Sequence, residues 1–132
     1  MSEQNIALHN AAVAAVREGR VPEELLAPGF LIENRVSAVT DYTYHGVVGW
    51  RDWVNDVFET FGRGASYEVE EIIDSGEDFV VASFCLTGTG ARSKLPLEFR
   101  WVGVTWFRGG QVIRAVGFPD REEALQAARG GS

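Results

Sequence analysis

The sequence predicts an α+β fold in which helices pack on one face of an antiparallel sheet. The first observation behind this prediction is the segment 46–61, whose bulky apolar side chains recur at helical spacing. The second is that the apolar period drops to two after this segment, which is typical of strands. The apolar face of the helix carries Trp50, Trp53, Val54, Val57, Phe58 and Phe61. An aromatic helix laid on a sheet predicts an enclosed pocket between them.

The N-terminal part is predicted to be mostly helical. In residues 5–17, leucine, valine and alanine recur on one face, and Gly19 ends this helix. Pro22 suits the first turn of a second, short helix, which Pro28–Gly29 stops. The elements predicted before the meander are helices 5–17 and 22–26, a strand 30–36, a loop 37–45 and the helix 46–61.

Four strands and a helix are predicted for the remainder. The strands are rich in Val, Ile, Phe and Trp, and short turns join them, so neighbours run antiparallel as a meander. They are predicted at 67–73, 79–87, 95–107 and 112–118. The last helix opens at Asp120, with Glu123 three residues later as in a capping box. No repeat or linker interrupts the body, and residues 1–132 are expected to form a single domain.

Composition excludes several classes of protein. The net charge is −7 and basic residues form no cluster, so a nucleic acid is not an expected partner. No apolar run approaches the ~20 residues of a membrane-spanning helix, so no membrane partner is expected. The N-terminus lacks the pattern of a secretory signal, and the single cysteine, Cys85, permits no internal disulfide. These features predict a cytoplasmic protein.

The strand 95–107 is apolar on both faces. Phe99, Trp101, Gly103 and Thr105 share one face, and Arg100, Val102, Val104 and Trp106 share the other. With the helices on one side, the outer face of the sheet would be expected to be polar. We therefore expect a second copy of the chain to cover the strip of Arg100, Val102, Val104 and Trp106, which predicts a homodimer.

Several short motifs occur in an order that resembles a known family. They are Glu18-Gly19-Arg20, the run from Leu26 to Asn34, Tyr44-His45-Gly46, the run from Val104 to Val112 and the run from Phe118 to Leu125. Together they cover most of the chain, and they resemble the nuclear transport factor 2-like superfamily, in particular its SnoaL-like branch of polyketide cyclase and ketosteroid isomerase relatives. The superfamily hosts enzymes and binding proteins alike, so the motifs are more specific for fold than for activity.

The resemblance implies a cone-shaped, curved sheet wrapped around the N-terminal helices and the aromatic helix, with a pocket opening at one end. Residues expected to line this pocket are Asn34, Trp53, Phe58, Phe99, Trp101 and Gly103. In ketosteroid isomerase-like members a carboxylate base, an acid and a tyrosine act on a carbonyl compound. Here those positions fall on Asn34, near Gly103 and near Ala12, so this machinery is missing. The Asp-Arg-Asp relay of epoxide hydrolase-like members is missing too, because the residue two positions after Arg100, where an acid is needed, is Val102.

Polar residues near the expected mouth of the pocket are weak catalytic candidates. They are Asn34, Asp41, Tyr44 and His45, and a histidine beside an acid and a tyrosine can move a proton near neutral pH. The alternative interpretation is that Tyr44 and His45 only close the loop before the helix. His9 is expected on the surface or at the rim. The glutamates at 68, 70 and 71 lack a nearby His or Cys, so no metal site is predicted, and no organic cofactor is expected.

Two functional hypotheses follow. In the first, the pocket binds a small, mostly apolar molecule, cyclic or similar to a polyketide or terpenoid, and assists an isomerase-, cyclase- or hydrolase-type reaction by acid–base chemistry without a cofactor. In the second, the protein is noncatalytic and binds a ligand or forms a dimeric interaction module. The sequence leaves open whether the protein is an enzyme.

Overall fold

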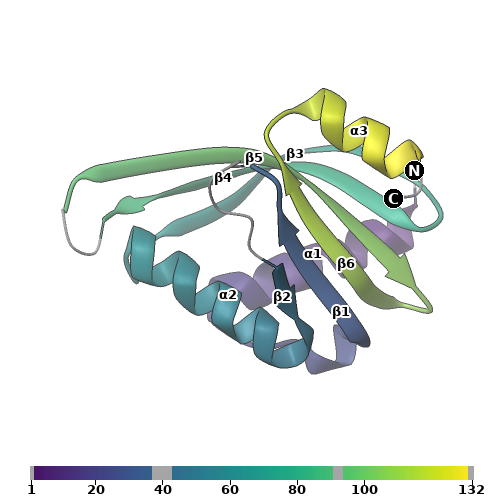
Figure 1. Ribbon diagram of the computed structural model, residues 1–132, viewed down its shortest axis with the longest axis horizontal. Helices are drawn as coiled ribbons and strands as arrows, with labels where there is room; N and C mark the ends of the chain where they lie inside the picture. The colour runs from purple at the N-terminus through teal and green to yellow at the C-terminus, as the bar shows by residue number, and fades with distance from the viewer. Residues whose placement is uncertain (1, 37–42, 91–93, 131–132) are drawn as a thin grey trace.

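The computed structural model describes residues 2–36, 43–90 and 94–130. They form an α+β fold in which a curved sheet holds helices in its concavity (Figure 1). The helices are α1 (Glu3–Glu18), the short 3-10 helix η1 (Glu23–Leu25), α2 (Gly46–Phe61) and α3 (Arg121–Arg129). The strands are β1 (Leu26–Asn34), β2 (Thr43–His45), β3 (Ser66–Ser75), β4 (Phe79–Thr89), β5 (Pro96–Arg108) and β6 (Gln111–Phe118). The predicted fold class is confirmed.

The strand order of the sheet is β2-β1-β6-β5-β4-β3. Strands β3 to β6 pair in sequence and antiparallel, as the short turns predict. The prediction of an antiparallel sheet is incomplete, because β1 pairs with β6 in parallel. The connection between these two strands includes α2 and the rest of the meander, and a crossover of that length permits a parallel neighbour.

The segment between α1 and α2 differs from the prediction. The expected helix 22–26 is reduced to η1, and β1 begins at Leu26 instead of residue 30. Pro28 and Gly29 lie inside β1, where the pairing with β6 shifts register between Leu26 and Leu31. A proline cannot donate to the ladder, and an irregular stretch of a strand tolerates it. The predicted loop 37–45 contains β2, whose described residues pair with β1, and residues 37–42 lie outside the described part.

The aromatic helix has the bounds that the sequence predicts. Trp50 and Val54 of α2 are buried, and Trp53, Val57, Phe58 and Phe61 pack against the same core. The Trp50 indole Nε1 donates a hydrogen bond to the Arg20 carbonyl oxygen at 3.2 Å, which ties α2 to the segment after α1. Beside it, α1 contributes Ala12, Val13, Ala15 and Val16 to this core. Both helices therefore bury one apolar face against the concave side of the sheet.

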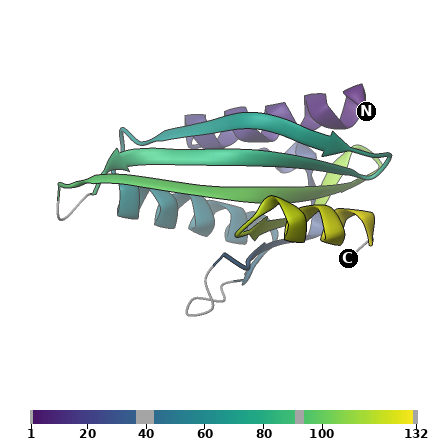
Figure 2. The same cartoon turned by 90° about the horizontal axis from the view of Figure 1, so that it is seen from above.

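Helix α3 lies on the other side of the sheet from α1 and α2 (Figures 1 and 2). The Asp120 carboxylate caps it by accepting a hydrogen bond from the Glu123 backbone N–H at 2.9 Å, which is one of the two hydrogen bonds of the predicted capping box. Ala124 and Ala128 of α3 are buried against β-strand residues of the outer face. The strand side of this contact consists of Val81, Val102, Val104, Trp106, Val116 and Phe118. The prediction that all helices share one face is therefore wrong.

This placement of α3 corrects the argument for a homodimer. Val104 is 0% exposed and Trp106 is 6% exposed, because α3 covers the strip that we expected a second copy to cover. Val102 is buried as well, and only Arg100 is exposed, where it forms ion pairs with Glu70 and Glu98. The outer face is apolar because it packs on a helix of its own chain. A dimer through this strip would require α3 to move away.

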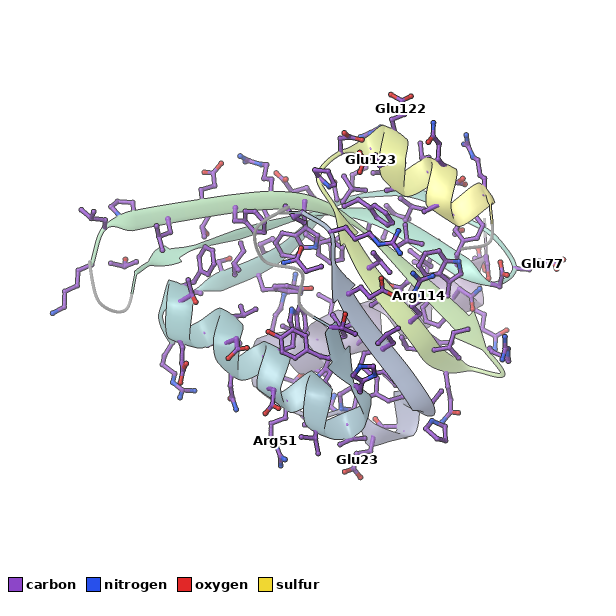
Figure 3. All side chains as sticks on the ribbon, in the orientation of Figure 1. Glu23, Arg51, Glu77, Arg114, Glu122 and Glu123 are labelled. Carbon is purple, nitrogen blue, oxygen red and sulfur yellow. The ribbon has the colours of Figure 1, made fainter. Side chains whose placement is uncertain are left out.

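Charged side chains occupy the outer surfaces of the helices on both sides of the sheet. Figure 3 shows Arg51 of α2 and Glu122 of α3 pointing away from the sheet. Among the described residues, no helix is both long and apolar enough to cross a membrane.

Candidate functional site

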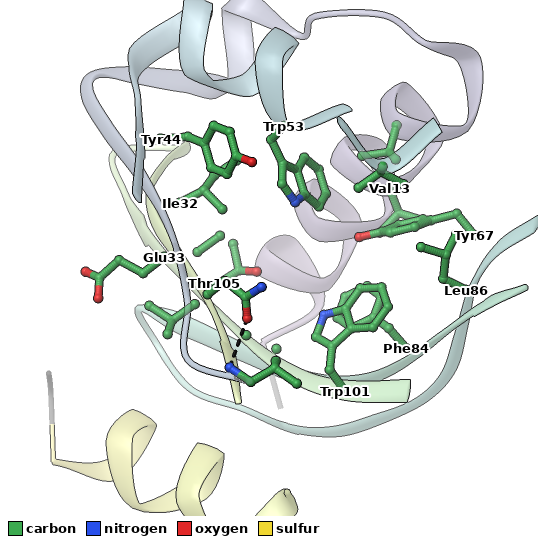
Figure 4. A pocket seen from close by; sticks show the side chains of 18 of the residues that line it. Val13, Ile32, Glu33, Tyr44, Trp53, Tyr67, Phe84, Leu86, Trp101 and Thr105 are labelled. Carbon is green, nitrogen blue, oxygen red and sulfur yellow. Dashed lines mark hydrogen bonds between the residues drawn. The ribbon is translucent and has the colours of Figure 1, made fainter. Parts of the chain in front are cut away.

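A cavity of about 260 Å³ lies between the concave face of the sheet and helices α1 and α2 (Figure 4). Its wall is mostly apolar and aromatic. Residues of the sheet and of helices α1 and α2 contribute, including Val13 of α1, Ile32 of β1, Trp53 of α2, Leu86 of β4 and Trp101 of β5. Small-molecule sites are typically concave and apolar, with a volume from about 300 Å³ upward. The cavity lies just below this range, so it suits a compact ligand of a few fused rings.

Five of the six residues predicted for the pocket lie on the cavity wall. They are Asn34, Trp53, Phe99, Trp101 and Gly103. Phe58 of α2 is not among the wall residues and packs against the hydrophobic core instead. Trp53, Val57 and Thr60 lie on one face of α2, which faces the cavity. Phe58 lies about 100° around the helix axis from Val57. Helical periodicity places Phe58 on the buried side of α2 but does not show whether its side chain faces the cavity or packs in the core.

Stacked aromatic rings form one wall of the cavity. The Trp101 ring stacks on Phe84 with centroids 5.1 Å apart and on Phe99 with centroids 5.4 Å apart. Two glycines make room for this stack. A Cβ atom on Gly103 would lie 2.8 Å from a Phe84 ring carbon, and one on Gly117 would lie 3.3 Å from the Trp101 ring. Because these positions have no side chain, the rings can pack closely over the strand backbone.

The three positions where the resemblance expects isomerase machinery all lie on the cavity wall. They are Ala12 on α1, Asn34 on β1 and Gly103 on β5. The Asn34 Oδ1 accepts a hydrogen bond from the Val36 backbone N–H at 2.9 Å. This bond holds the amide in place and leaves its N–H groups as donors.

Tyr44 and an acid that the sequence analysis did not select meet at the mouth of the cavity. The Tyr44 hydroxyl donates a hydrogen bond to Asp56 Oδ2 at 2.6 Å, and both residues lie on the cavity wall. Asp56 is exposed, three residues after Trp53 on α2, and that spacing was the signal that could have identified it. His45 is exposed at the start of α2 and is not among the wall residues. Asp41 lies outside the described residues.

A second carboxylate, that of Glu33, lies beside the cavity but points away from it (Figure 4). Its Oε1 accepts hydrogen bonds from Arg114, whose Nε lies at 3.0 Å. Its Oε2 accepts another from Arg35 at 3.1 Å. The negative charge of Glu33 is therefore paired with two arginines on the outer side of β1. Among the described residues, no three His, Cys, Asp or Glu side chains gather as metal ligands would.

His9 is a wall residue that the sequence analysis placed wrongly on the surface or rim. It is 3% exposed, and its ring lies 5.7 Å from the Phe84 ring, centroid to centroid. Its Nδ1 has no hydrogen-bond partner among the described residues. Burial lowers the pKa of His9 to about 4, although the Asn10 side chain opposes this shift. The spacing of three and four residues to Ala12 and Val13 places His9 on the apolar face of α1, which was the available signal.

The buried imidazole should make stability depend on pH. In the folded state His9 takes up a proton only near pH 4, whereas in the unfolded state it does so near 6.5. The unfolded state therefore binds more protons between these values, and stability falls as the pH falls through this window. We expect a loss of about 3 kcal/mol from this residue, measured by urea unfolding at each pH.

The variant His9→Gln provides the control for this prediction, because glutamine does not titrate. Its free energy of unfolding should change less with pH than that of the wild type across the same window, and carboxylates contribute equally to both. Parallel curves for the two proteins would contradict the prediction.

Comparisons with known proteins identify the fold. No family model matches the chain, and no curated protein matches it. Solved structures do match over nearly its whole length. A protein of unknown function from Burkholderia pseudomallei, described as nuclear transport factor 2-like, superposes with a TM-score of 0.73 at 18% identity, covering 96% of this chain and 97% of the other. The chain has the nuclear transport factor 2-like fold.

Two further structures with this fold carry functional descriptions of their own. A candidate SnoaL-like polyketide cyclase from Jannaschia sp. CCS1 superposes with a TM-score of 0.72 at 21% identity, covering 96% of this chain and 94% of the other. The protein TerC, co-crystallised with polyporic acid, superposes with a TM-score of 0.72 at 18% identity, covering 94% and 99%. At these identities the likeness shows the shared fold, and the activities belong to those proteins.

Proposed function

We propose that the protein binds a small, flat, mostly apolar molecule in the cavity between the sheet and helices α1 and α2. The observation that carries this proposal is the stack of Phe84, Trp101 and Phe99 along one wall, opposite the Trp53 indole. An aromatic wall favours a flat conjugated ligand, because edge-to-face and offset-stacked ring contacts add to the free energy of burying apolar surface. The size of the cavity limits this ligand to a few fused rings.

The nuclear transport factor 2-like neighbours support this proposal. TerC was crystallised with polyporic acid, so at least one protein with this fold was crystallised with a small organic molecule. The homodimer and the cytoplasmic location stay predictions.

A titration with the tricyclic hydrocarbon fluorene tests the proposal. Four tryptophans are present, and Trp50, Trp53 and Trp101 lie on the cavity wall, so binding should change the tryptophan fluorescence in a saturable manner. At a hundredfold excess over its dissociation constant, the ligand should stabilise the fold by about 2.7 kcal/mol. A linear fluorescence change without any shift of the unfolding midpoint would contradict the proposal.

A second candidate function is acid–base catalysis at the mouth of the same cavity. The 2.6 Å hydrogen bond from the Tyr44 hydroxyl to Asp56 favours it, since a carboxylate held in place beside an apolar cavity can accept a proton from a bound ligand. Asn34, at the position of the family's base, would then orient the ligand through its amide N–H groups.

We expect catalysis of this type to appear as exchange of the α-protons of 2-tetralone in D2O, followed by NMR. Asp56→Asn should slow the protein-catalysed exchange by at least about a hundredfold, because the amide has no usable basicity, and should leave affinity within about twofold. Asp52→Asn is the matched control, an exposed acid one turn earlier on α2. Exchange that is equally fast in both variants would exclude Asp56 as the base, and wild-type exchange at the buffer rate would favour binding alone.

A further inference from the structure

Three hydrogen-bond donors face the same part of the cavity. Figure 4 shows the indole nitrogens of Trp53 and Trp101 and the hydroxyl of Tyr67 turned towards one space. The rings are neighbours, since the Tyr67 ring centroid lies 6.2 Å from that of Trp53 and 5.8 Å from that of Trp101. The donors come from α2, β3 and β5, so only the folded chain brings them together.

None of these three groups forms a hydrogen bond with another residue of the described part of the chain. Trp50 behaves differently, because its indole N–H donates to the Arg20 carbonyl oxygen. The side chain of Tyr67 is 6% exposed and lies within an apolar wall. Burial there raises the pKa of its hydroxyl, which favours the protonated form that can donate a hydrogen bond. An indole nitrogen can only donate.

We infer that Trp53, Tyr67 and Trp101 form a donor subsite for an acceptor oxygen, such as a carbonyl or phenolate oxygen, on a flat conjugated ligand. This inference rests on the proposed function, since it names the chemical class of the molecule bound in the same cavity. It makes the three residues determinants of specificity, and it assigns Tyr67 a role that no motif in the sequence indicates.

The physical reason for the selectivity is the fate of the donors when the cavity is filled. A ligand without an acceptor displaces water from the N–H and O–H groups and leaves them unpaired, which is unfavourable in an apolar wall. A ligand with an oxygen at this point replaces those hydrogen bonds. Sites built to hydrogen-bond a ligand reject analogues that lack the partner more strongly than apolar sites reject a change of size.

Fluorene and 9-fluorenone form a matched pair for the test, because they share one tricyclic skeleton and differ by a methylene group against a carbonyl group. Equilibrium dialysis should show fluorenone binding at least about tenfold more tightly, once the affinities are corrected for the water–hexadecane partition of each compound. Tyr67→Phe should reduce this ratio by at least about threefold, and its affinity for fluorene should not fall, because fluorene offers the Tyr67 hydroxyl no acceptor. Trp106→Phe is the control variant, since this indole lies on the other face of the sheet, under α3.

The infrared spectrum of fluorenone bound to the wild-type protein gives a second readout that needs no variant. Its carbonyl stretch should move below the value in hexane, as a hydrogen bond requires. Equal affinities for the two compounds, or a carbonyl stretch at the hexane value, would overturn the donor subsite and leave the proposed function standing. Failure of both compounds to bind would overturn the two together.

Discussion

Replacement of Ala124 with glutamate is expected to detach α3 from the sheet and to lower the free energy of unfolding by about 3 kcal/mol. Ala124 is 0% exposed and packs among the apolar residues of the outer face. A glutamate there would either bury an unpaired carboxylate or force the helix away. The second outcome exposes Val104, Trp106 and neighbouring apolar residues, whose burial contributes about 25 cal/mol per Å². Urea unfolding measures the loss of stability.

Gln126→Glu is the matched control for Ala124→Glu. It adds the same charge to the same helix, two residues further on, at an exposed position. We expect its stability to stay within about 0.5 kcal/mol of the wild type. The Ala124→Glu variant should also self-associate, since its outer face is uncovered, and size-exclusion chromatography would detect this. Equal stabilities for the two variants would show that α3 contributes nothing to the fold.

Replacement of Ala12 with leucine is expected to block ligand binding without harming the fold. Ala12 lies on the cavity wall, so the added carbons extend into space that the proposed ligand occupies. Affinity for fluorene should fall by at least about a hundredfold, because a rigid ring system cannot move aside in a cavity of this size. Stability should change little or rise, since leucine buries new apolar surface and is a good helix former.

Ala11→Leu provides the comparison for this second prediction. Ala11 is the preceding residue of α1 and is exposed, so the same change of residue leaves the cavity unaltered. Its affinity for fluorene should match the wild type in the same fluorescence titration. If Ala12→Leu also binds fluorene with wild-type affinity, the ligand binds elsewhere and the proposed site is wrong.

Some features of the candidate site could be predicted from the sequence. The helical spacing of Trp53 in α2 and the alternation of Phe99, Trp101 and Gly103 in β5 decide which face each residue presents, and these four residues lie on the cavity wall. Asn34 was placed on the wall through the resemblance. For Phe58 the periodicity was too coarse, because residues one helical position apart can lie on either side of the boundary between cavity and core.

Other features of the site required the folded chain. Asp56 of α2 meets Tyr44 of β2, twelve residues earlier in sequence. Tyr67 lies beside Trp53 and Trp101, which belong to two other elements. Helical spacing places His9 on the apolar face of α1, but only the folded chain shows that this face lies in the concavity of the sheet. Its low pKa is a consequence of that burial.

The sequence by itself determined α1, α2, the antiparallel meander and the cap of α3, because each depends on the periodicity and turn chemistry of residues close together in the chain. Only the tertiary structure decided which face of the sheet α3 covers. A helix of nine residues with a narrow alanine face can pack on either side of a sheet whose two faces are both apolar. The choice depends on long-range packing, since α1 and α2 already fill the concave side, and the outer strip with Val104 and Trp106 is the apolar surface left for α3 to cover.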